Sequence, residues 1–251
     1  MAAPMHGRSR TAPPRTLDLP PPFRLVRLRE VGDAFDHAKS IASEMGAGTL
    51  VHVGRFDLIE LAVVLEPEEP LRMARRAFYT AMVALRDALI SHAPPERPIV
   101  YTWPDSILVD GGLVGGGRLA WSAGTAESET PEWLVFGACI RTVAIGEAGL
   151  RPLMTALAEE GFDDLTSDRL VESFARHLMF AIDNQQTDGF AVTARNYVAH
   201  LAHEKGSSPT LDDVGDLLVR WRGQQEPDRH VLTTALTAPS WLDPATGGPR
   251  A

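Results

Sequence analysis

Residues 102–121, TWPDSILVDGGLVGGGRLAW, bring a glycine strip and a cation together in one short stretch. Gly112 and Gly115–Gly117 leave a length of backbone without side chains, on which a ligand or another backbone can lie closely. Arg118 follows directly, and a guanidinium is well suited to bind a phosphate or a carboxylate. We therefore predict a ligand site floored by the glycines, with Arg118 as its charged group. A bulged hairpin that turns a sheet corner, with Arg118 as a solvated strand residue, is the plainer alternative.

Four other groups of side chains that could bind a ligand or react each have a structural interpretation as well. Trp103 can wall a ligand pocket or lie buried at the end of a strand. Asp105 can bind a metal or a ribose, or cap a turn before Ser106. Cys139 lies in an apolar stretch with no histidine nearby in sequence, which favours a small core residue over a nucleophile. The eight histidines show no HxH or HExxH spacing, so no metal site is predicted.

Strands and helices that would position these groups follow one another without regular βαβ alternation, which predicts an α+β fold. Apolar residues at helical spacing predict a helix over 35–45 that ends at Gly46. Six strands are expected in the main sheet. They cover residues 23–29, the hairpin 49–65, the two strands of 102–121 and the strand 133–145. Helices are expected over 71–91 and from Ser167 onward.

Composition limits the function classes. The 251 residues carry a net charge of −9 without a basic stripe, which argues against nucleic-acid binding. No run of 18 apolar residues predicts a membrane span, and a single cysteine fits a reducing cytoplasm. Three regions are expected: a flexible Pro/Arg-rich tail over 1–22, one large domain over 23–204, and a small C-terminal β segment and tail over 205–251.

Six segments, in order along the chain, resemble the biotin/lipoate protein ligase family. Residues 33–42 resemble its first helix, and residues 165–195 its long helix with the E-G-F/L-x-P segment that follows. Trp103-Pro104-Asp105 stands for its WPND block, and Val114-Gly115-Gly116 for its glycine block. Residues 133–145, WLVFGACIRTVAI, resemble its GIGIN strand, and residues 211–220 the start of its small C-terminal barrel. The resemblance covers about residues 23–236. It implies a class II biotin ligase-like mixed sheet with packed helices, plus a small C-terminal β-hairpin or reduced barrel.

The resemblance also implies an activity: a ligase or acyltransferase that modifies proteins by attaching or transferring a biotinyl, lipoyl or octanoyl group to a carrier-protein lysine. The ligands would be ATP with magnesium and biotin or lipoate, and the partner a biotinyl or lipoyl carrier domain. Arg118 would be catalytic, and the ligand would be bound by Trp103, Asp105, Gly115, Gly116, Gly117 and Arg141. Bulk at Gly116, as in Gly116→Val, is expected to block the ligand with little loss of fold.

The departures from the family fall on its chemistry. Leu113 stands in the place of the catalytic lysine, and Arg141 in the place of the GIGIN asparagine. Asp33-Ala34-Phe35 replaces Ser-Thr-Asn, and the glycine-arginine loop is replaced by a tight hairpin around Gly54-Arg55. The alternative is therefore a non-catalytic relative that binds an acyl or adenylyl ligand, or a protein partner. Two cations converging on Gly115–Gly117 would favour adenylation.

Overall fold

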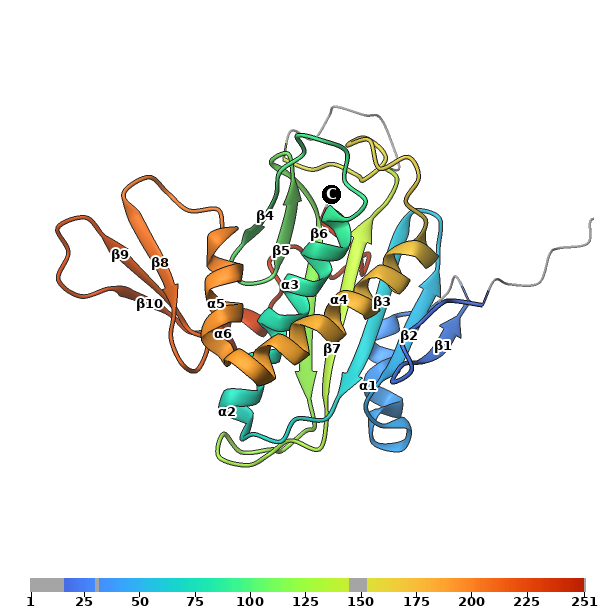
Figure 1. The fold of residues 1–251 in the computed structure, drawn as a ribbon, viewed down its shortest axis with the longest axis horizontal. Helices are drawn as coiled ribbons and strands as arrows, with labels where there is room; N and C mark the ends of the chain where they lie inside the picture. The colour runs from blue at the N-terminus through green and yellow to red at the C-terminus, as the bar shows by residue number, and fades with distance from the viewer. Residues whose placement is uncertain (1–15, 30–31, 145–152, 251) are drawn as a thin grey trace, which may run out of the picture.

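The computed structural model describes residues 16–29, 32–144 and 153–250. Its main element is a seven-stranded mixed sheet in the order β1-β2-β3-β7-β6-β5-β4 (Figure 1). Only β1 and β2 pair in parallel; the other neighbours are antiparallel. The strands are β1 (Arg24–Leu28), β2 (Thr49–Gly54), β3 (Leu58–Leu65), β4 (Ile99–Thr102), β5 (Ser106–Val109), β6 (Gly112–Trp121) and β7 (Leu134–Arg141). The sheet has one strand more than predicted, because the short stretch after Pro98 pairs with β5 as β4.

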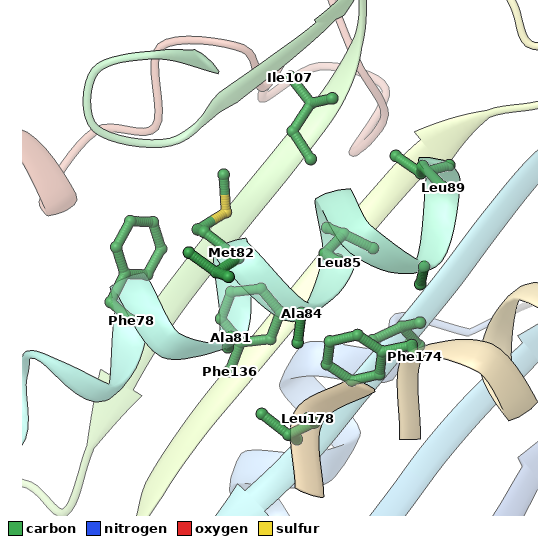
Figure 2. Close-up of a cluster of buried hydrophobic side chains, with 14 of the residues drawn as sticks. Phe78, Ala81, Met82, Ala84, Leu85, Leu89, Ile107, Phe136, Phe174 and Leu178 are labelled. Atoms are coloured by element: carbon green, nitrogen blue, oxygen red, sulfur yellow. The ribbon is translucent and has the colours of Figure 1, made fainter. Parts of the chain in front are cut away.

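Helices α3 (Ala77–Ile90) and α4 (Ser167–Asp188) cover one face of the sheet (Figure 1). Helix α3 is apolar nearly all round, which is typical of a helix packed between a sheet and a second helix. Figure 2 shows Phe78 and Leu85 of α3 packed near Phe136 of β7 and Phe174 of α4. The predicted helix over 71–91 is interrupted, since α2 (Leu71–Ala74) precedes α3 as a separate turn.

Helix α1 (Ala34–Met45) lies on the opposite face of the sheet and confirms the helix predicted over 35–45. Asp33 begins the helix, because its carboxylate accepts from the backbone N–H groups of Phe35 and Asp36. The apolar stripe of α1 packs on Val51 and Val64 of β2 and β3. Gly137 of β7 lets the Phe35 ring lie directly on the strand, where a β carbon would be 3.0 Å from the Cβ of Phe35.

A small antiparallel sheet in the order β10-β9-β8 stands beside the main sheet (Figure 1). It consists of β8 (Ser207–Leu211), β9 (Leu217–Trp221) and β10 (Asp228–His230). Helix α5 (Phe190–Ala199) leads into it, and α6 (Leu232–Leu236) follows it, within the region 205–251 that was expected to hold only β structure and a tail. Leu217, Leu232 and Leu236 join the core of the main domain. The small sheet is thus the reduced C-terminal β structure of the predicted α+β fold.

None of the helices in the described ranges is long and apolar enough to span a membrane.

Candidate ligand cleft

The glycine strip on β6 is needed for close backbone approach. The Gly117 N–H donates to the Asp105 carbonyl over 2.8 Å. A β carbon on Gly116 would lie closer to that carbonyl oxygen than any real contact, and 2.6 Å from Nε1 of Trp241. The ladder between β5 and β6 also shifts register between Ile107 and Leu108, as expected for a bulged hairpin. The expectation that Gly116→Val leaves the fold intact is therefore wrong.

The side chains of Trp103 and Asp105 point to different parts of the molecule. The Trp103 indole N–H donates to the Tyr79 hydroxyl over 2.9 Å, and its ring contacts that of His230. Trp103 therefore lies where the small sheet meets the main domain. The Asp105 carboxyl is buried beside the glycine strip, and its burial raises its pKa. It accepts from Ser240, through the backbone N–H at 2.9 Å and the hydroxyl at 2.6 Å.

Arg118 is held by the start of α1. Its guanidinium donates to both carboxylate oxygens of Asp33, over 3.1 and 3.2 Å, and lies 4.5 Å from the centre of the Phe35 ring. The side chain is only 13 % exposed, and its Nε has no hydrogen-bond partner. Asp33 thus caps α1 and neutralises Arg118 at the same time. The predicted catalytic cation is fixed in an ion pair at the point where the family's Ser-Thr-Asn is replaced.

A second charged group on this face was missed by the sequence analysis. Arg55 donates to both oxygens of Asp57, over 3.1 and 2.8 Å, and to Glu60 over 3.3 Å. Burial raises the pKa of Glu60, and the negative charge of Asp33 acts in the same direction. Glu60 is the only charged residue of β3, LIELAVVL, and a lone charge inside an apolar strand was the available signal.

Arg141 contacts the chain itself rather than an open cleft. Its guanidinium donates to the carbonyl oxygens of Pro249 and Arg250, over 2.6 and 3.1 Å. These residues belong to a segment over 237–250 that crosses the sheet face after α6. Trp241 of the same segment is fully buried, and its indole N–H donates to the Gly117 carbonyl over 3.0 Å. Nothing in the local sequence pattern predicted this contact, because more than 120 residues separate Trp241 from the strip.

An apolar cluster fills the floor beneath Trp241. Leu58 and Cys139 are buried with the indole, and Leu113 and Leu242 pack at its edge. Burial raises the pKa of the Cys139 thiol, and the nearby Glu60 carboxylate adds to the shift. Cys139 is fully buried in this apolar cluster, as predicted for a small core residue. Leu113, in the place of the lysine, is part of this apolar contact.

Asp105, Gly116, Gly117 and Arg141 thus lie together beneath the 237–250 segment, while Trp103 points elsewhere. Gly115 pairs with Ile140 at the edge of this group. Near the strip lie three guanidinium groups, those of Arg55, Arg118 and Arg141, and four carboxyl groups, those of Asp33, Asp57, Glu60 and Asp105. The described part of the cleft offers no surplus positive charge, so its residues do not fit a nucleoside triphosphate. No group of three or more His, Cys, Asp or Glu in the described ranges is arranged to hold a metal ion.

Comparisons with known proteins agree with this fold. The profile of the Biotin/lipoate A/B protein ligase family matches residues 19–199, and the chain belongs to that family. A biotin protein ligase-like protein of unknown function from Silicibacter sp. TM1040 is 29% identical, with a TM-score of 0.75 over 88% of this chain and 99% of that one. No curated protein matches the chain.

Two structures of biotin protein ligase from Aquifex aeolicus share the fold at lower identity. The apo structure is 14% identical, with a TM-score of 0.66 over 84% of this chain and 96% of that one. The structure in complex with biotin and ATP is 15% identical, with a TM-score of 0.60 over 82% and 98%. The predicted family and fold class are confirmed, whereas the roles of the cleft residues stay predictions.

Proposed function

We propose that the chain is a ligand-binding member of the biotin/lipoate A/B protein ligase family that does not adenylate its ligand. Its ligand is a small acyl compound that binds over Gly116 and Gly117 and reaches Arg141. The observation that supports the proposal is that two guanidinium groups of the described site are already bound by groups of the chain itself. Arg118 is paired with Asp33, and Arg141 is engaged by backbone carbonyls.

Adenylation needs what this arrangement lacks. Attack of an acyl carboxylate on a nucleotide phosphate concentrates negative charge, which preorganised cations must stabilise. The loss of one such group typically costs about 10²–10³ in rate. Leu113 supplies no charge, and the guanidinium of Arg118 is already compensated by Asp33. A ligand that brings a single carboxylate or carbonyl oxygen makes a smaller demand, which Arg141 meets in exchange for the carbonyls of Pro249 and Arg250.

Transfer of a biotinyl, lipoyl or octanoyl group to a carrier-protein lysine is the second candidate. It is supported by the family and by the Aquifex relative that was crystallised with biotin and ATP. It requires ATP and magnesium, biotin or lipoate as the acyl donor, and a biotinyl or lipoyl carrier domain as partner. Under either candidate we place the protein in the cytoplasm, where its single cysteine stays reduced, with no role in nucleic-acid binding.

Pyrophosphate exchange separates the two candidates. The parent, Arg118→Ala and Leu113→Lys are assayed with biotin, lipoate and octanoate, and binding of each compound is measured by calorimetry without nucleotide. We expect the parent to bind at least one acyl compound and to show no exchange. Exchange gained only in Leu113→Lys indicates a scaffold that retained its pocket and lost its catalyst. Robust exchange in the parent that survives Arg118→Ala would establish the ligase instead.

A further inference from the structure

The 237–250 segment occupies the site that the sequence assigns to a ligand. Ser240 binds the Asp105 carboxylate, Trp241 lies on Gly116, and Arg141 holds the carbonyls of Pro249 and Arg250. Each of these contacts uses a residue predicted from the sequence to bind a ligand. No strand of the main sheet pairs with the segment.

The segment makes its own compact loop. The Arg250 N–H donates to the Trp241 carbonyl over 2.7 Å, and Leu242 bridges to Pro249 in antiparallel fashion. Trp241, Gly248 and Pro249 are buried, whereas residues 244–247 and the connection at Thr237–Ala238 are exposed. The loop can therefore leave the cleft as a unit about this exposed connection, and the ladders between β5, β6 and β7 would stay intact.

We propose that the 237–250 segment is an internal competitor that fills the cleft until a ligand displaces it. The groups it presents define the class of that ligand. A planar ring lies on Gly116 with an N–H donor aimed at the Gly117 carbonyl, and an acceptor oxygen, carbonyl or carboxylate, reaches Arg141. The ligand class rests on the proposed function, whereas opening of the segment can be measured independently of any ligand.

The rate at which Cys139 is chemically labelled measures the opening of the 237–250 segment. Cys139 is the single cysteine of the chain, it is fully buried, and it packs against Trp241. Labelling of the full-length protein with iodoacetamide is followed over a series of urea concentrations below the unfolding transition. Local opening gives a rate that depends weakly on urea, whereas global unfolding gives the full dependence seen at equilibrium.

We expect weak urea dependence in the parent and at least tenfold faster labelling in Trp241→Ala. Trp133→Ala is the matched control, because Trp133 packs in a separate apolar cluster that contains neither Cys139 nor Trp241, and its indole N–H donates to Ser43. Its labelling rate should stay within about twofold of the parent. Labelling that follows only global unfolding in the parent, or equal acceleration in both variants, would overturn the proposal.

A reversible disulfide between the 237–250 segment and the sheet tests the competition and leaves Trp241 in place. The hydroxyl oxygens of Ser106 and Ser240 are 2.8 Å apart, so Ser106→Cys with Ser240→Cys can form a disulfide across the cleft. Binding of biotin, lipoate and octanoate is measured by calorimetry in the oxidised and reduced states. We expect at least tenfold weaker binding when the disulfide is formed and recovery on reduction. Equal binding in both states would overturn the competition.

The movement of the segment and the class of ligand can be refuted separately. Local opening of Cys139 combined with no binding of any probe to Trp241→Ala would defeat the proposed ligand class and the proposed function, while the movement of the segment would stand. Binding to the parent without local opening would support the proposed function and remove the internal competitor.

Discussion

Gly116→Ala tests whether the glycine strip is shaped by close packing or is spare space for a ligand. The added methyl group would lie 2.6 Å from Nε1 of Trp241 and nearer still to the Asp105 carbonyl oxygen. Real β carbons essentially never come within 3.0 Å of such atoms. Either β5 or the 237–250 segment must therefore move, and with it the hydrogen bond from Gly117 to Asp105.

The magnitude follows from three opposing effects. Overpacking of a tight site costs about 1–3 kcal/mol, and a backbone oxygen on one side places this site at the upper end. Weakening one backbone hydrogen bond adds about 1 kcal/mol. Alanine in place of glycine returns about 0.5–1 kcal/mol, because the unfolded chain has less freedom to lose. We expect Gly116→Ala to lower the free energy of unfolding by about 2–3 kcal/mol.

Gly54→Ala is the matched control for this measurement. Gly54 ends β2, and a β carbon there would meet no atom within 4 Å. Equilibrium urea unfolding of the parent and both variants gives the comparison, and Gly54→Ala should be neutral or slightly more stable. Equal stability of Gly116→Ala and Gly54→Ala would refute the close approach of Asp105 and Trp241 to the strip.

Two further changes probe charge and pH. Asp33→Asn keeps a capping side chain on α1 but leaves the charge of Arg118 uncompensated, so phosphate should bind about tenfold more tightly by calorimetry, a gain of about 1.4 kcal/mol. Asp36 is exposed, and Asp36→Asn should show no gain. Unchanged phosphate affinity in Asp33→Asn would contradict the role of Asp33 in neutralising Arg118. Burial lowers the pKa of His52, whose Nδ1–H donates to the Glu60 carbonyl. The unfolded chain therefore binds a proton on His52 more readily than the folded chain does. As the pH falls below about 6.5, the free energy of unfolding of the parent, measured with urea, should fall relative to that of His52→Gln. The loss is up to about 1.4 kcal/mol for each pH unit by which burial lowers the pKa. A pH-independent difference would mean that His52 is not held neutral.

Local sequence patterns were sufficient to predict the glycine strip and the close approach that it allows. Consecutive glycines between two β-forming stretches specify a strand that another backbone or a ring can approach, and the fold uses the strip in both ways. Asp33 was noted only as a departure from the family, and neither its role as the cap of α1 nor its ion pair with Arg118 was predicted. The co-location of Asp105, Gly116 and Arg141 followed from the family resemblance.

Long-range contacts account for what could not be predicted. Arg118 and Asp33 are 85 positions apart, and Trp241 and Gly117 are 124 apart. Neither pair has a periodic signature, because periodicity reports only which face of one element is apolar. Trp103 was assigned to the ligand site through its match to the family's WPND block, but its indole reaches Tyr79 of α3. Adjacent residues in a turn can serve opposite sides of a sheet.

The apolar residue at position 113 and the buried indole at position 241 depend on one another. Leu113 packs at the edge of the cluster formed by Trp241, Leu58 and Cys139. An ammonium group at this position would be partly removed from water by that cluster. Burial of such a charge costs several kcal/mol, comparable to what one buried aromatic side chain contributes. A lysine here and a closed 237–250 segment are therefore hard to combine, so the departure from the family's catalytic residue and the occupied cleft have a common physical cause.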